Sequence, residues 1–195
     1  MRRTGLLGVI CTLVLAGLTG CSPATEGAVG VRLDAAGRLV GVFDWCHGGT
    51  DKIALFLGQD DGSVGDGVID LERGPGRARA AEEITLLDPG AGWQTTPAPS
   101  GLDDNRIYDL RAWNRGGGTV DDFPFRISEL RGRTGSAVIL SKRWEGEARG
   151  GFVAAFYTPE DFARYADEVC DGRRCGCCPF FARSRLLWAD AEHRR

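Results

Sequence analysis

Short stretches of alternating hydrophobic and polar residues recur along this chain, with turn residues such as Gly, Asp and Asn between them. Residues 52–57 show the pattern most clearly, because Ile53, Leu55 and Leu57 fall on one face of an extended strand. The same criterion predicts seven strands, over residues 29–33, 39–45, 52–57, 68–72, 83–87, 107–113 and 123–127. Residues 93–101 show no period and are expected to be irregular. Short strands separated by turn signals favour a mainly β fold in which two sheets pack together.

A different pattern follows the seventh predicted strand. Residues 137–140 and 151–157 are apolar and predict an additional β-hairpin, with residues 142–147 as its polar turn. Thr158 then precedes a proline and two acidic residues, which is typical of a helix start because the hydroxyl caps free N–H groups and the acids favour the positive end of the dipole. A C-terminal helix is therefore predicted over residues 159–170. Its apolar side chains form one stripe: Phe162, Tyr165, Ala166 and Val169.

Leu102 stands six positions before Tyr108, and apolar side chains alternate with polar ones after that tyrosine. Trp45 ends the second predicted strand. These features resemble the tyrosine corner and the core tryptophan of fibronectin type III and immunoglobulin-like domains. The resemblance covers about residues 28–128, and it implies that the Tyr108 hydroxyl bonds back to the chain upstream. The same residues also fit another all-β arrangement, in which Tyr108 is an ordinary buried side chain.

The first residues of the chain indicate where the protein is located. Arg2 and Arg3 precede an apolar run from Leu6 to Leu18, and a Leu-Thr-Gly-Cys sequence then ends at Cys21. This arrangement resembles the lipobox of bacterial lipoproteins. The resemblance implies cleavage before Cys21, a diacylglyceryl thioether on its sulfur, and a mature chain held on the extracytoplasmic side of a cell membrane. A plain transmembrane anchor is the alternative, but the apolar run has only 13 residues, whereas a bilayer needs about 20.

The chain therefore divides into four parts. Residues 1–20 form the expected lipoprotein signal peptide, and residues 21–27 form a short tether. Residues 28–170 are expected to be an immunoglobulin- or fibronectin-III-like sandwich, with the additional β-hairpin and the C-terminal helix. Residues 171–195 are basic, rich in cysteine and without periodicity, so we expect a disordered extension or a reading-frame artefact.

Charge is distributed unevenly between the body and the tail. Residues 22–170 contain 16 basic and 24 acidic residues, whereas residues 171–195 contain six arginines and three acidic residues. Nucleic-acid binding requires clustered positive charge to replace the counterions of the phosphates. The acidic body therefore argues against a nucleic acid as the partner.

Five cysteines remain after the signal peptide and the lipidated residue are set aside. Disulfides are expected because the predicted compartment is oxidising. The preferred pair is Cys46 with Cys170, since each ends a predicted element within the body of the domain. Cys175, Cys177 and Cys178 lie in the tail without the paired spacing of structural zinc sites, so no metal site is predicted.

No motif for catalysis stands out, and no cofactor is predicted. His47 is the only histidine before the tail, and the chain has no Gly-x-Ser-x-Gly sequence. Residues 61–72 match the length of a calcium-binding loop, but Asp66 occupies the position that requires glycine. The acidic pairs 103–104 and 121–122 are expected to be solvated loop charges. No catalytic residue is therefore assigned, and the chain is not expected to be an enzyme.

Tryptophans near loops are the remaining candidates for a binding site. Trp93, Trp113 and Trp144 occupy such positions, and tryptophan is enriched at binding surfaces. Trp113 and Trp93 are taken as candidate binding residues, Trp113 foremost because a triple-glycine loop follows it. We expect a non-catalytic binding or structural module of the cell envelope, attached to the membrane through Cys21, with an envelope protein or glycan as its partner. The alternative is an envelope hydrolase with a dispersed carboxylate site.

Overall fold

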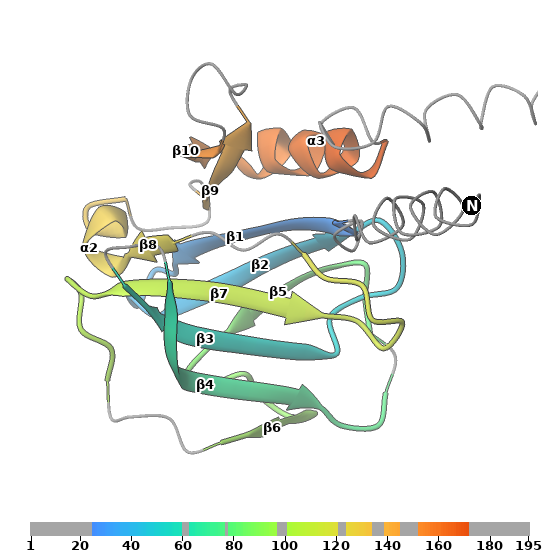
Figure 1. The fold of residues 1–195 in the computed structure, drawn as a ribbon, viewed down its shortest axis with the longest axis horizontal. Helices are drawn as coiled ribbons and strands as arrows, with labels where there is room; N and C mark the ends of the chain where they lie inside the picture. Colours follow the sequence, from blue (N-terminus) through green and yellow to red (C-terminus); the bar gives the residue numbers. More distant parts are fainter. Residues whose placement is uncertain are drawn as a thin grey trace, which may run out of the picture.

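The computed structural model describes residues 25–59, 63–76, 78–96, 101–120, 124–133, 139–144 and 152–171. Within these ranges the chain forms two antiparallel sheets of five strands each, which pack as a sandwich (Figure 1). The mainly β fold predicted from the sequence is confirmed. None of the described helices is long and apolar enough to cross a membrane. The lipobox with Cys21 and the tail cysteines lie outside the described residues.

The first sheet has the strand order β10-β9-β1-β2-β5. Its strands, in chain order, are β1 (Gly27–Leu33), β2 (Leu39–Trp45), β5 (Ala81–Thr85), β9 (Ile139–Trp144) and β10 (Phe152–Tyr157). The predicted additional hairpin is thus β9-β10, which extends this sheet beyond β1.

The second sheet has the strand order β6-β4-β3-β7-β8. Its strands are β3 (Lys52–Gly58), β4 (Val64–Arg73), β6 (Trp93–Thr95), β7 (Ile107–Trp113) and β8 (Pro124–Arg126). In an immunoglobulin-like sandwich, strands A, B and E lie in one sheet and strands C, F and G in the other. Here β1, β2 and β5 share one sheet, while β3, β7 and β8 share the other, which is the same division.

Side chains from both sheets form one hydrophobic core. The face of β3 that was predicted to be buried is buried at Ile53 and Leu55, and Leu57 packs partly exposed against the same core. Phe43 and Trp45 of β2 enter this core from the first sheet. Each such large side chain contributes about 1.5 to 3 kcal/mol through its burial. The core therefore accounts for the pairing of the two sheets.

Tyr108 forms the predicted corner. Its hydroxyl accepts a hydrogen bond from the backbone N–H of Asp103 at 2.8 Å, and its ring is buried. Leu102, just upstream, packs partly buried against the core. The hydroxyl thus bonds back to the chain before β7, as the resemblance to fibronectin type III domains implied.

Two predictions on local structure were wrong on the β6 and β8 side. Residues 93–101 were expected to be irregular, but residues 93–95 form β6 because they pair with the end of β4. Residues 123–127 were expected to be one strand. Instead β8 ends at Arg126, and the short helix α2 (Ile127–Leu130) follows. The Arg126 N–H donates to the Glu129 carboxylate at 2.7 Å. This contact caps the first turn of the helix without help from a distant residue.

The predicted turn over residues 142–147 was also placed too early. Residues 142–144 belong to β9 and pair with residues 152–154 of β10. The charged side chains Lys142 and Arg143 suggested a turn, but the pairing with β10 keeps both residues in the strand, where Lys142 is buried. The extra pairing lengthens the hairpin beside β1.

Helix α3 (Pro159–Cys170) forms where it was predicted and covers the outer face of the first sheet (Figure 1). The Thr158 hydroxyl accepts a hydrogen bond from the N–H of Asp161 at 3.1 Å, as expected for an N-cap. The predicted stripe packs on three side chains of the sheet: Ala28, Val42 and Ile139. Gly30 permits this approach, because a Cβ there would overlap Ile139 and lie 3.2 Å from the Phe162 ring.

The C-terminal end of α3 is joined to the end of β2. Cys46 and Cys170 form a disulfide, with their Cα atoms 5.2 Å apart. This is the pair preferred from the sequence, and 124 positions separate its two members. The bond fixes the last turn of α3 against the first sheet.

Candidate functional site

The two outer faces of the sandwich differ in what lies on them. Helix α3 packs against β1, β2 and β10, and so covers one face. On the opposite face a hollow of about 590 Å³ opens across β4, β3 and β7. We call it the outer groove and define it by six residues: Lys52, Ala54, Phe56, Asp70, Thr96 and Trp113.

Strand β3 forms the middle of the outer groove because its side chains alternate between the two faces. The core residues Ile53 and Leu55 alternate with Lys52, Ala54 and Phe56, which line the outer groove, although Ala54 itself is buried. The ladder between β3 and β7 places Trp113 opposite Lys52. Phe56 follows four residues later, so the two rings lie on either side of the short Ala54 side chain. Between the two aromatic rings lie Ala54 on β3 and, opposite it on β7, Arg111.

The charged side chains around the two rings are paired. The Lys52 Nζ lies 3.1 Å from the Asp70 carboxylate, and both side chains are about half exposed. The Arg111 Nε lies 2.9 Å from the Asp109 carboxylate. The Arg111 guanidinium carbon also lies 5.6 Å from the centre of the Phe56 ring. This face therefore presents cations and carboxylates side by side.

Of the tryptophans selected from the sequence, Trp113 lies in the outer groove. No protein family, curated protein or solved structure matches this chain. Its function is therefore inferred from the described side chains. Phe56 was missed, although an aromatic residue on the polar side of an alternating strand is a signal that the sequence contained.

Trp93 has a different environment. It packs against the core, and the Arg73 guanidinium carbon lies 4.3 Å from the centre of its ring. Packing and a cation–π contact account for this side chain. Trp93 is therefore not part of the outer groove. The side chain of Trp144 lies outside the described residues.

The histidine and the acidic residues considered from the sequence do not form a common site among the described residues. His47 is exposed on the loop after β2. Asp66 is exposed on β4, and Asp61 and residues 121–122 lie outside the described residues. Asp104 is a partly exposed loop residue, and its carboxylate also binds the Arg131 guanidinium at 2.7 and 2.8 Å, which lowers the pKa of Asp104. Among the described residues, no group of three or more His, Cys, Asp or Glu side chains is placed to hold a metal ion.

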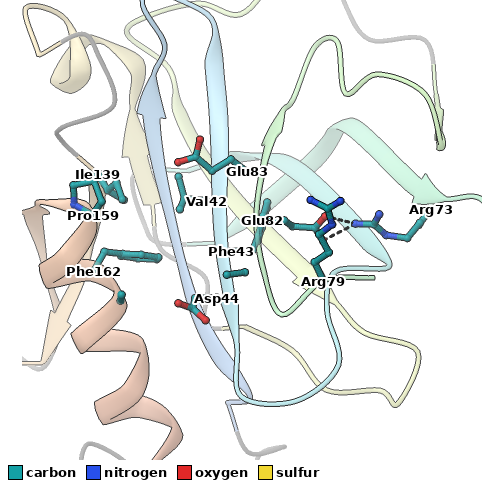
Figure 2. Close-up of a pocket in the computed structure, with 12 residues that line it drawn as sticks. Val42, Phe43, Asp44, Arg73, Arg79, Glu82, Glu83, Ile139, Pro159 and Phe162 are labelled. Carbon is teal, nitrogen blue, oxygen red and sulfur yellow. Dashed lines mark hydrogen bonds and ion pairs between the residues drawn. The ribbon is translucent and has the colours of Figure 1, made fainter. Parts of the chain in front are cut away.

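A second hollow, of about 660 Å³, lies between the first turn of α3 and strands β2 and β5 (Figure 2). We call it the acidic hollow because Asp44, Glu82 and Glu83 line it. Glu83 forms two hydrogen bonds with Arg32, and Glu82 forms two with Arg73. Neighbouring residues in a strand point to opposite faces, so the two glutamates do not converge.

Asp44 is the remaining carboxylate of the acidic hollow. Burial raises its pKa above the ordinary value of 3.8, and the nearby negative charge of Asp167 on α3 adds to the shift. The folded protein thus holds the neutral form at a pH where the unfolded chain is already ionised. Stability is therefore lost as the pH rises from 3.8 through the folded-state pKa.

Replacing Asp44 by asparagine should remove this cost. We expect Asp44→Asn to raise the free energy of unfolding at neutral pH by less than about 1 kcal/mol, because the group is partly solvated. At a pH below 3.8 the variant and the parent should be equally stable. Urea unfolding at several pH values measures both effects. Asp167→Asn is a second test variant, since removing that charge should lower the pKa of Asp44. If all three proteins show the same dependence of stability on pH, the pKa of Asp44 is not raised by burial and Asp167.

Proposed function

We propose that this chain is a non-catalytic binding module of the cell envelope, held to a membrane through a lipid on Cys21, which contacts its partner with the outer groove. The observation that supports binding is the placement of Trp113 and Phe56 in one hollow, on either side of Ala54. Aromatic side chains in a hollow with a few polar groups are typical of binding sites. The disulfide between Cys46 and Cys170 supports an oxidising compartment.

The second candidate is a hydrolase that uses the acidic hollow. The raised pKa of Asp44 favours it, since a general acid must stay protonated near the working pH. A hydrolase of this kind also needs a second carboxylate across the substrate. Glu83 is the described carboxylate on the same face of the sheet, and it is bound to Arg32. The outer groove therefore supports the binding module better than the acidic hollow supports the hydrolase.

The lipid anchor is tested by the mass and location of the mature protein. In a bacterial expression host, the membrane-extracted chain should begin at Cys21 and have the added mass of the acyl chains. Cys21→Ser should remove this added mass, because serine lacks the thiol that would form the thioether. A parent chain that does not begin at Cys21, or that lacks the added mass, would contradict the anchor.

The binding module is tested with the full chain containing Cys21→Ser, so that the lipid does not contribute. We expect this protein to co-sediment with isolated bacterial envelopes. Trp113→Ala or Phe56→Ala should each weaken retention about tenfold, which corresponds to about 1.4 kcal/mol.

Phe156→Ala is the matched control for this experiment. Phe156 is an exposed aromatic residue on β10, with the Arg133 guanidinium carbon 3.9 Å from its ring centre. It resembles Phe56 in chemistry but lies in the other sheet. This variant should be retained like the parent. If Trp113→Ala and Phe56→Ala are also retained like the parent, the outer groove is not the contact surface.

A further inference from the structure

The charges on the outer groove restrict the chemistry of its ligand. Lys52 is paired with Asp70, and Arg111 is paired with Asp109. An anionic ligand would have to displace one of these carboxylates, and a cationic ligand would have to displace one of the bases. Hydroxyl groups both donate and accept hydrogen bonds. Neighbouring hydroxyls can therefore bind an ammonium and a carboxylate at the same time without separating them.

The two aromatic rings of the outer groove can contact the C–H groups of a ligand that also has hydroxyl groups. An aromatic face is electron-rich, so it attracts the C–H groups that a pyranose ring presents on one side. Trp113 is level with Lys52, and Phe56 lies four residues along β3, which corresponds to about 13 Å in a strand. Two platforms at this spacing suit an extended chain of several sugar rings.

Gly67 keeps one end of the outer groove open. It lies opposite Phe56 in the ladder between β3 and β4. A Cβ at Gly67 would meet only the Phe56 ring, at 3.9 Å, so a larger side chain there would lie over that ring. The position is exposed and its φ is not positive, so a substitution occludes the ring without straining the backbone.

We infer that the outer groove binds a neutral, extended oligosaccharide, which stacks on Trp113 and Phe56 and forms hydrogen bonds with the Lys52–Asp70 pair. This inference rests on the proposed function and specifies the ligand class of the same site. The envelope partner is then the glycan of the cell envelope and not one of its proteins.

The test uses the full chain containing Cys21→Ser and four soluble probes: chitohexaose, cellohexaose, maltohexaose and hexagalacturonate. Isothermal titration calorimetry should show saturable binding of at least one of the two extended neutral probes, chitohexaose or cellohexaose. The indole N–H signal of Trp113 should shift on binding. Trp113→Ala and Phe56→Ala should each weaken binding about tenfold or more, and Phe156→Ala should not. Because the ligand is uncharged, affinity should change little between about 0.05 and 0.5 M salt.

Gly67→Leu tests the outer groove independently of the alanine variants, because it removes no aromatic ring and no charge. It should abolish oligosaccharide binding while its thermal unfolding stays like that of the parent. If Gly67→Leu binds like the parent, the oligosaccharide does not use the outer groove.

The outcomes separate the ligand class from the proposed function. If neither chitohexaose nor cellohexaose binds, whether or not maltohexaose does, while envelope retention still depends on Trp113, the ligand class is wrong and the binding module survives. Preferential binding of hexagalacturonate also overturns the neutral class. If neither the envelopes nor the probes bind, the proposed function fails together with the inference.

Discussion

Replacing both Cys46 and Cys170 by serine is expected to lower the free energy of unfolding by about 4 kcal/mol, within the range measured for native disulfides that close long loops. The reason is the length of the loop, because the bond joins residues 124 positions apart and restricts the unfolded chain. Chemical denaturation of the oxidised parent and of the double variant measures the difference. The two single variants should each lose a similar amount, since either one removes the bond.

The disulfide variant should also loosen one element more than the others. The buried stripe of α3 packs against the outer face of the first sheet, and Cys170 is its last residue. Without the bond, hydrogen exchange should accelerate in α3 before it does in β3 and β7. The outer groove lies on the opposite sheet, so retention on envelopes should persist while the sandwich stays folded. A loss below about 1 kcal/mol, or unchanged protection of α3, would contradict this role.

The alternation of side chains was sufficient to predict most of the fold. Strands such as β3 and β7 bury one face, so their period of two is visible without any partner strand. The Cys46–Cys170 pair was also predictable, because the predicted compartment favours oxidation and both residues end an element. The Tyr108 corner was implied by the resemblance to fibronectin type III domains, which the spacing between Leu102 and Tyr108 carries. Each of these signals is local or concerns composition.

The remaining features depend on contacts between distant residues. Strand β6 has three residues, and its pairing with β4 determines it more than its own sequence does. The outer groove was only partly predicted, since Trp113 was selected but Phe56 and Asp70 were not. Their proximity depends on β3 lying between β4 and β7, and the sequence does not specify that order.

Arg73 is a structural residue that the sequence did not reveal, because it begins a stretch rich in Gly, Pro and Arg that gives no sign of a buried ion pair. Its guanidinium forms two hydrogen bonds of 2.5 Å with the Glu82 carboxylate, and its Nε donates to the Thr50 carbonyl at 2.6 Å. It also covers the Trp93 ring. Arg73 belongs to β4 and Glu82 to β5, so the pair joins the two sheets.

Arg73→Met is expected to lower the free energy of unfolding by about 3 to 5 kcal/mol, because it leaves a buried carboxylate without its partner. The Arg73 and Glu82 side chains are only 15% and 11% exposed, so water cannot replace the lost contacts. Adding Glu82→Gln to this variant should recover most of the loss, since the buried charge is then gone as well. Urea unfolding of the four proteins in this double-mutant cycle measures the coupling.

Arg131→Met is the control that separates burial from ion pairing itself. The Arg131 and Asp104 side chains also form two hydrogen bonds, but they are 52% and 35% exposed. This variant should lose less than about 1 kcal/mol. If Arg73→Met costs no more than Arg131→Met, the pair between the sheets does not stabilise the sandwich. If it costs several kcal/mol and Glu82→Gln restores stability, then a single buried pair holds together β4, which borders the outer groove, and β5, which borders the acidic hollow.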